Sequence, residues 1–366
     1  MSMQSAVPAS RGVVRAAVVS CALVLALLLS TAVPASAATV TTVADGFIGP
    51  LGLAVGADGT IYVGESFAGQ LTAIDRRGVR EVVATNTGPG GEVAGVDALG
   101  SGRVVYLTSD MPDPEGAPAN GQLRRLEPRG GSSQIAHLLD YEVATNPDAG
   151  VAYGLRGLSG ECAAQLPPFV LPYTGLVDSH PYKVAITSGG YLVADAGGND
   201  IVKVSTSGRQ LETVAVLPAI PQVVTAEVAA EFGLPDCVVG LTYDGESVPT
   251  DVEVGPDGDY YVTTLPGAPE LPGFGMVWRI DADTHAVELV SDGFSGATDL
   301  AVARDGTIYV AELFGGQISQ IAPDGTVSVL TPLPGAATVE LGRRGELYAT
   351  TVDFATGMGS LVRITP

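Results

Sequence analysis

Apolar and polar residues alternate along most of this chain in short runs that are separated by glycine-containing turns. One stretch occurs twice: Gly52–Ile74 (GLAVGADGTIYVGESFAGQLTAI) and Asp299–Ile321 (DLAVARDGTIYVAELFGGQISQI) agree at 14 of 23 positions. Each copy contains an apolar strand, an Asp-Gly turn, an alternating strand, a second turn and a third strand. Repeated four-stranded units of about 40 residues are typical of β-propellers, so the pattern predicts this all-β fold.

Six such units can be placed by the turn between their first two strands. Asp-Gly and Gly-Gly between alternating strands favour two-residue hairpins, because glycine tolerates positive φ. The sequence therefore predicts a six-bladed β-propeller, formed as a single domain by residues 38–366. The six turns are Asp58-Gly59, Ser101-Gly102, Gly189-Gly190, Asp257-Gly258, Asp305-Gly306 and Arg344-Gly345.

The two ends of this domain are predicted to complete one blade together. The last unit has only three strands before Pro366, and an additional strand, Thr39–Ala44, precedes the first unit. Closing the ring removes open sheet edges, which are liable to pair with other chains. We therefore expect the N-terminal strand to complete the last blade.

Two insertions interrupt the otherwise regular spacing of the turns. The spacing between the second and fourth units exceeds the repeat length, which predicts insertions near 145–177 and 219–247, the second with a short helix at Thr225–Gly233. Cys162 lies in the first insertion and Cys237 in the second. In an oxidising compartment these cysteines either form a disulfide that joins the insertions or remain two buried thiols.

Residues 1–37 have the features of a secretory signal peptide. Arg11 and Arg15 precede the apolar run Val18–Leu29, and Ala35-Ser36-Ala37 provides small residues for cleavage near Ala37. The apolar run is short for a membrane span. We expect a secreted, extracellular protein without stable membrane insertion; an uncleaved anchor is the alternative.

The composition narrows the choice of partners. The chain has 40 acidic and 18 basic residues and a formal net charge of −22. Such an acidic protein repels nucleic acid and anionic lipid, so we expect a monomer whose partner is a small-molecule ligand or another protein. The charge suits cations, although acidic surfaces also serve solubility alone.

Acidic residues recur where the second strand of a unit ends. In a propeller the loops after the second strand share one face with the loops that enter the first strand. Carboxylates from several blades would meet there, as the oxygen ligands of a divalent cation such as Ca²⁺ do. Alternatively, these side chains only accept hydrogen bonds from the backbone. The candidate metal ligands are Glu65, Asp195, Asp299 and Glu312.

Aromatic residues follow some of these acids. An apolar lip around a polar pore suits a small aromatic or amphipathic ligand, and packing between blades is the alternative. His180, at the start of a first strand, is also the candidate general base. No Gly-x-Ser-x-Gly motif supports nucleophilic catalysis. The candidate ligand-binding residues are Phe67, Phe314, Phe354, His180 and Asp251.

The repeats resemble the NHL-repeat and SMP-30-like propellers, and more closely the secreted bacterial ScyD/ScyE family, named after the scytonemin pigment cluster. Three segments carry the resemblance: Val40–Val55, Ser179–Val204 and Val248–Ile280. It implies a six-bladed, extracellular propeller without an established reaction. The chain departs from the family at His180, where Asn is usual, and at Thr263-Thr264-Leu265, where Gly-Glu-Leu is usual. Ile48-Gly49-Pro50 replaces the Glu-Gly-Pro entry of SMP-30 lactonases.

The sequence thus predicts a propeller that binds a small molecule or partner at its channel mouth. A metal-dependent hydrolase or lactonase of SMP-30-like type is the second interpretation, with the four carboxylates as ligands. The third is a protein-interaction platform on the insertions.

Overall fold

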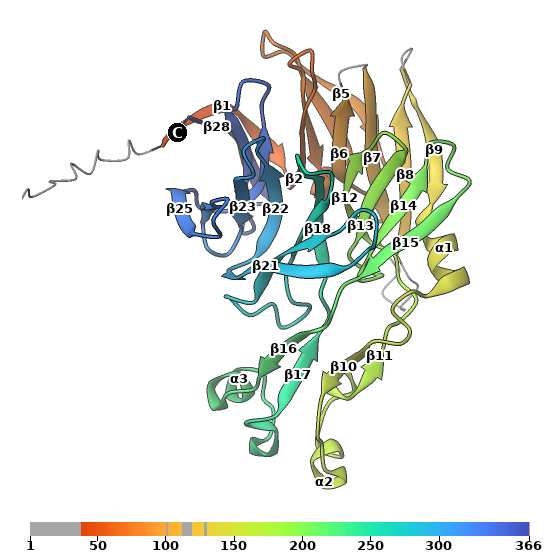
Figure 1. Cartoon of the computed structure of the whole chain (residues 1–366), viewed down its shortest axis with the longest axis vertical. Coiled ribbons are helices and arrows are strands. Elements are labelled where there is room, and N and C mark those ends of the chain that lie inside the picture. The colour runs from red at the N-terminus through yellow and green to blue at the C-terminus, as the bar shows by residue number, and fades with distance from the viewer. Residues whose placement is uncertain (1–37, 100–101, 112–118, 128–129, 366) are drawn as a thin grey trace, which may run out of the picture. The chain divides into compact units, whose positions relative to one another are not determined.

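The chain is folded almost entirely into four-stranded antiparallel sheets (Figure 1). The computed structural model describes residues 38–99, 102–111, 119–127 and 130–365, and the predicted signal peptide, residues 1–37, lies outside them. Among the described residues no helix is both long and apolar enough to pass through a membrane.

Six of the sheets are the predicted repeats, and we number them as blades in chain order. Blade 1 is β2 (Pro50–Val55), β3 (Ile61–Glu65), β4 (Gln70–Ile74) and β5 (Arg80–Thr85). Blade 2 is β6 (Glu92–Leu99), β7 (Arg103–Asp110), β8 (Asn120–Leu126) and β9 (Ser132–His137). Blade 3 is β12 (Pro181–Ile186), β13 (Gly190–Asp195), β14 (Asp200–Ser205) and β15 (Leu211–Val216).

The remaining blades have the same antiparallel order. Blade 4 is β18 (Pro249–Val254), β19 (Tyr260–Thr264), β20 (Gly275–Ile280) and β21 (Val287–Phe294). Blade 5 is β22 (Ala297–Val302), β23 (Ile308–Glu312), β24 (Gln317–Ile321) and β25 (Val327–Pro332). Blade 6 is β26 (Ala336–Leu341), β27 (Leu347–Asp353), β28 (Met358–Thr365) and β1 (Thr39–Ile48).

The first strands of the blades contact one another in a closed cycle, β2, β6, β12, β18, β22, β26 and back to β2. A ring of sheets with its first strands innermost is the β-propeller, and the predicted fold class is confirmed. The ring is closed by β1, which pairs antiparallel with β28 from Thr39 opposite Thr365 to Ile48 opposite Met358. This strand is longer than the predicted Thr39–Ala44 because Phe47 is buried against blade 1.

In blades 1, 4, 5 and 6 the turn between the first and second strands is longer than the predicted two-residue hairpin, whereas in blade 3 the Thr187 amide donates to the Gly190 carbonyl across two residues. In blade 1 the amide of Gly56 donates to the carbonyl of Thr60 at 2.8 Å, and Gly59, with φ of 82°, donates to the carbonyl of Gly56. The Asp58 carboxylate accepts a hydrogen bond from the Thr60 amide at 3.0 Å. The Asp58 side chain thus provides the hydrogen-bond acceptor for an amide of the turn. This contact stabilises a turn that is longer than two residues.

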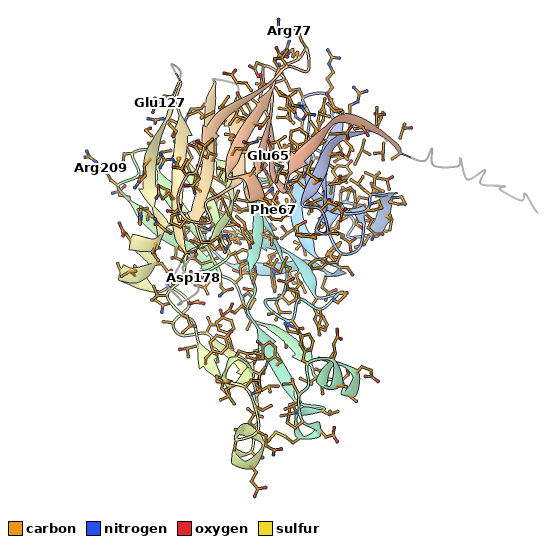
Figure 2. The ribbon with its side chains drawn as sticks, turned by 180° about the vertical axis from the view of Figure 1, so that it is seen from behind. Glu65, Phe67, Arg77, Glu127, Asp178 and Arg209 are labelled. Carbon is orange, nitrogen blue, oxygen red and sulfur yellow. A yellow bond between two sulfur atoms is a disulfide. The ribbon has the colours of Figure 1, made fainter. Side chains whose placement is uncertain are left out.

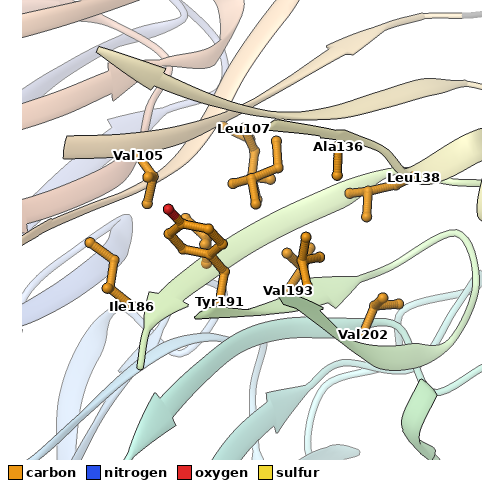
Figure 3. Packing of buried hydrophobic residues seen from close by; sticks show 12 residues of the cluster. Val105, Leu107, Ala136, Leu138, Ile186, Tyr191, Val193 and Val202 are labelled. Atoms are coloured by element: carbon orange, nitrogen blue, oxygen red, sulfur yellow. The ribbon is translucent and has the colours of Figure 1, made fainter. Parts of the chain in front are cut away.

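Apolar side chains fill the space between neighbouring blades. Figure 3 shows Val105 and Leu107 of blade 2 facing Tyr191, Val193 and Val202 of blade 3. All five are almost completely buried. Burying each such side chain contributes about 1.5–3 kcal/mol, so the contacts between blades contribute substantially to holding the ring together.

The two insertions form a further sheet that projects from the blades (Figure 1). We call it the cap sheet. Its strands lie in the order β11 (Tyr173–Thr174), β10 (Ala152–Leu155), β17 (Thr242–Gly245) and β16 (Ile220–Val223). Short helices surround it: α2 (Gly160–Ala163), η2 (Pro168–Val170), α3 (Ala226–Glu231) and η3 (Asp236–Val238).

A disulfide between Cys162 and Cys237 links the two insertions, with Cα atoms 6.0 Å apart. The helix predicted at Thr225–Gly233 is α3, and the hydroxyl of Thr225 accepts the Val228 amide at 3.2 Å as its N-cap. Helix α1 (Leu138–Thr145) was not predicted, because its apolar start continues the alternation of β9.

Candidate functional site

A cavity of about 430 Å³ opens at one mouth of the central channel. Its lining comes from the first strands of several blades and from the loops after their second strands, including η1 (Ser66–Ala68). Figure 2 shows Phe67 at the end of its blade nearer the cap sheet, whereas Arg77 lies at the opposite end. The cavity and the cap sheet therefore belong to the same face of the ring.

Three phenylalanines predicted from the repeats lie on the rim of this cavity. Phe67 and Phe314 are each 46% exposed, and Phe354 is 57% exposed. The rings of Phe67 and Phe354 are 6.1 Å apart. Phe67 and Phe314 lie over Gly49 and Gly296, where an added Cβ would come within 2.6 Å of the ring. Glycine at these positions lets each ring lie against the backbone while its other face remains accessible.

Polar groups lie among the apolar residues that line the cavity. Glu92, Glu270, Tyr182 and Lys183 contribute them. The Lys183 ammonium is already paired with the carboxylate of Asp299. Burial lowers the pKa of Lys183. Lys183 is paired with Asp299 and Glu92 contacts His180, which leaves Glu270 as the lining carboxylate without a basic partner among the described residues.

His180 is held beside the cavity by two acidic neighbours. Its Nε2 lies 2.8 Å from Oε2 of Glu92, and its backbone amide donates to Asp195 at 2.7 Å. The ring packs edge-on against Tyr182, with centroids 4.7 Å apart. Burial lowers the pKa of His180, but the hydrogen bond and charge of Glu92 outweigh it, so the pKa is raised. The imidazole Nε2 is thus engaged by Glu92, so this setting does not favour His180 as a general base.

Glu65 and Glu312 perform the same structural task in two blades. Glu65 accepts hydrogen bonds from the Ile48 amide at 2.8 Å and from the side chains of Gln70 and Thr72. Glu312 accepts the equivalent set, from the Ser295 amide at 2.8 Å and the side chains of Gln317 and Ser319. Each carboxylate thereby fastens the loop that enters its blade to the third strand of that blade.

Asp195 and Asp299 are engaged in the same way. Asp195 accepts hydrogen bonds from the Ser179 hydroxyl and the His180 amide, at 2.6 and 2.7 Å. Asp299 accepts the Val339 amide of the next blade at 3.0 Å and pairs with Lys183.

The structure does not bring Glu65, Asp195, Asp299 and Glu312 together as the ligands of one cation within the described residues. Among them no three His, Cys, Asp or Glu side chains are grouped so that they could hold a metal ion. The physical reason is that each carboxylate already accepts hydrogen bonds from backbone or side-chain donors of the protein, and Asp299 in addition pairs with Lys183. Glu65 and Glu312 therefore occupy equivalent positions of the repeat because both carboxylates stabilise the fold.

Asp251, predicted as a ligand-binding residue, does not line the mouth cavity. Its carboxylate accepts the amide of Val252 and, at 2.8 Å, the amide of Leu300 in blade 5. Asp97 similarly accepts the Ile186 amide of blade 3 at 2.6 Å. These buried aspartates join the first strands of adjacent blades.

The sequence reasoning missed the polar residues of the mouth. Lys183 had a detectable signal, since it is one of only two lysines in the chain and sits in an apolar first strand. Glu92, Tyr182 and Glu270 had no comparable signal. Their place in the cavity depends on how the blades meet, which no local pattern encodes.

Comparisons with known proteins support the fold. No family model matches the sequence, and no curated protein matches it. A gluconolactonase from Xanthomonas campestris is similar at TM-score 0.55 and 13% identity, covering 90% of each chain. A putative glucose dehydrogenase from Thermus thermophilus has TM-score 0.53 and 18% identity over 90% of this chain and 100% of its own. A protein of unknown function from Bacteroides thetaiotaomicron has TM-score 0.58 and 10% identity, over 90% and 76%. At such identities the similarity shows the β-propeller fold alone.

Proposed function

We propose that this propeller binds a small amphipathic molecule at its channel mouth. The observation that carries the proposal is the aromatic rim, because Phe67, Phe314 and Phe354 leave about half of each side chain exposed around one cavity. Exposed apolar groups that are gathered around a concave, partly polar site are typical of ligand pockets.

The charge of the mouth indicates which amphipathic molecules fit best. Glu92 and Glu270 line the cavity. Lys183 is neutralised by Asp299 and Glu92 contacts His180, so Glu270 provides the negative charge without a basic partner among the described residues. A ligand with an aromatic body and a protonated amine would stack on the rim and place its cation near these carboxylates. An anionic ligand of the same shape would be repelled.

We also propose that the protein acts outside the cytoplasm and is of ScyD/ScyE type. The signal-like residues 1–37 support export, and so does the Cys162–Cys237 disulfide, since such bonds persist in oxidising compartments. The ScyD/ScyE assignment rests on the sequence resemblance of blades 3 and 4, and the comparisons support it only as far as the propeller fold.

Titration calorimetry with tryptamine and indole-3-propionate tests the proposed ligand class. The two probes share one ring and differ in the sign of their charge. We expect tryptamine to bind the wild-type protein and indole-3-propionate to bind at least about tenfold more weakly, a difference of about 1.4 kcal/mol. In Phe67→Ala/Phe314→Ala, tryptamine binding should weaken by about tenfold, because two stacking surfaces are removed.

Phe169→Ala is the matched control. Phe169 is a still more exposed phenylalanine in η2, beside the cap sheet, and is not among the residues that line the mouth. This variant should bind tryptamine as the wild type does. Equal affinity for the two probes would contradict the proposal. So would a tryptamine affinity that is unchanged in Phe67→Ala/Phe314→Ala.

A further inference from the structure

A second cavity, of about 100 Å³, lies against the cap sheet. Its floor is a row across three paired strands, because Leu155 of β10 lies opposite Tyr243 of β17, which lies opposite Gln222 of β16. Its walls include Phe169 and Phe232. Nearly all of this lining is apolar.

Gln222 is the exception, and its amide has no partner. The side chain is 2% exposed, yet neither its Nε2 nor its Oε1 makes a hydrogen bond. The amide lies over Gly245, where an added Cβ would be 2.7 Å from Nε2. Burying an amide without partners costs free energy, about 1–3 kcal/mol by mutational data. A ligand that presents a peptide group beside this apolar cavity would satisfy both the donor and the acceptor of Gln222.

The cavity adjoins a free strand edge. β16 is the edge strand of the cap sheet, and Val223 beside Gln222 is 61% exposed. The amide of Val224 donates to the carbonyl of Leu241 in the connection to β17. In an antiparallel pair hydrogen-bonded residues alternate, so the backbone of Val223 points away from β17. An edge of this kind can accept one more strand.

The surroundings are strongly acidic. Between Ala152 and Thr174 and between Ile220 and Gly245 the chain has five carboxylates and a single basic residue, Arg156, which pairs with Asp244. The other four acidic residues are Glu161, Glu227, Glu231 and Asp236. The cap sheet therefore attracts basic partners and repels acidic ones.

We propose that this cavity binds an extended, basic peptide segment of a partner protein. One apolar side chain of the segment fills the cavity, and the neighbouring peptide group satisfies both atoms of Gln222. The rest of the segment follows the edge of β16, with lysine or arginine facing the acidic residues. A volume of about 100 Å³ suits a single aliphatic side chain, and the open edge suits the chain that carries it.

Fluorescence anisotropy with labelled, end-blocked peptides tests this site. The first probe is Lys-Val-Leu-Val-Lys, the second is Glu-Val-Leu-Val-Glu, and the third carries an N-methyl group on the leucine of the first. We expect the basic peptide to bind the wild type, and the acidic and N-methylated peptides to bind at least about tenfold more weakly.

Gln222→Met removes the amide and keeps its size. We expect it to weaken binding of the basic peptide by about tenfold and to abolish the effect of N-methylation, because the partner of that N–H is gone. In the free protein the same variant should melt at or above the wild-type temperature, since an unpaired buried amide is lost. A glutamine with a structural partner would instead lower the melting temperature.

Phe67→Ala, at the channel mouth, is the control and should leave peptide affinity unchanged. Failure of all three peptides to bind, equal binding of the acidic and basic peptides, or an N-methyl effect that persists in Gln222→Met would each overturn the proposal. Tryptamine binding at the mouth is measured separately, so the two proposals can fail independently.

Discussion

Three buried carboxylates in or beside blade 3 each keep one oxygen without a hydrogen-bond partner: Glu142 Oε1, Asp148 Oδ1 and Asp200 Oδ1. Burial, followed by the charges of neighbouring acids, raises the pKa of Glu142 to about 8 and raises that of Asp200 well above its ordinary value. Burial also raises the pKa of Asp148. The folded protein therefore retains protons that the unfolded chain releases, so this cluster should make stability fall as pH rises.

Glu142→Gln should stabilise the protein at high pH. Between the ordinary pKa of 4.5 and the folded value of about 8, the native state binds more protons than the unfolded state, so stability decreases with increasing pH. Glutamine mimics the protonated form and removes this loss. We expect the melting temperature at pH 8.5 to rise by roughly 2–4 °C, and the variant and wild type to converge below pH 4.5.

Thermal unfolding followed by circular dichroism from pH 4 to 9 measures this difference. Glu212→Gln, an exposed carboxylate on β15, is the matched control and should parallel the wild type at every pH. A Glu142→Gln protein that melts below the wild type at pH 8.5 would show that the carboxylate stabilises the folded chain through its ionised form.

At the scale of elements, β1 is the component on which ring closure depends. It pairs with β28 along its whole length, and Phe47 is buried against blade 1 with the Arg80 guanidinium 4.4 Å from its ring. Deleting residues 1–48 exposes the edge of β28 and removes these contacts. We expect the free energy of unfolding to fall by about 5 kcal/mol or more, a large part of the usual total.

Urea unfolding of two truncations checks this expectation. Deletion of residues 1–37 alone retains all of β1 and serves as the control, whereas deletion of 1–48 removes the strand. We expect a lower midpoint, or no cooperative transition, only for the longer deletion. Equal midpoints would mean that β1 contributes nothing to closure.

The elements that the sequence predicted are those whose signal is local and repeated. Alternation and Asp-Gly turns located the blades, and Thr225 located the start of α3. The cap sheet was not predicted, because its strands are short and each pairs with a partner from a distant insertion. The same distinction applies to the sites. Phe67 and Phe314 follow from the repeat, whereas the unpartnered amide of Gln222 exists only after two insertions meet.

At the scale of the whole molecule, the two cavities share one structural wall. The loop between β19 and β20 contributes Leu265 and Glu270 to the channel mouth, and Ala268 and Leu271 to the cavity on the cap sheet. The cap sheet is in turn built from two insertions that flank blade 3 and are joined by the Cys162–Cys237 disulfide. The disulfide therefore holds the second cavity together without lying in it.

Removing the disulfide should damage the cap sheet more than the ring. The bond joins residues 75 apart in sequence, and in the chain-entropy model a loop of this size contributes about 4 kcal/mol. The blades have several hydrophobic clusters of their own, whereas the cap sheet depends on one cluster that includes Cys162 itself. In Cys162→Ala/Cys237→Ala we expect a lower melting temperature and loss of Lys-Val-Leu-Val-Lys binding, with tryptamine binding retained. Reductant should reproduce this pattern in the wild type and leave the double variant unchanged. Loss of both binding activities together would show that the ring itself, and not only the cap, depends on the bond.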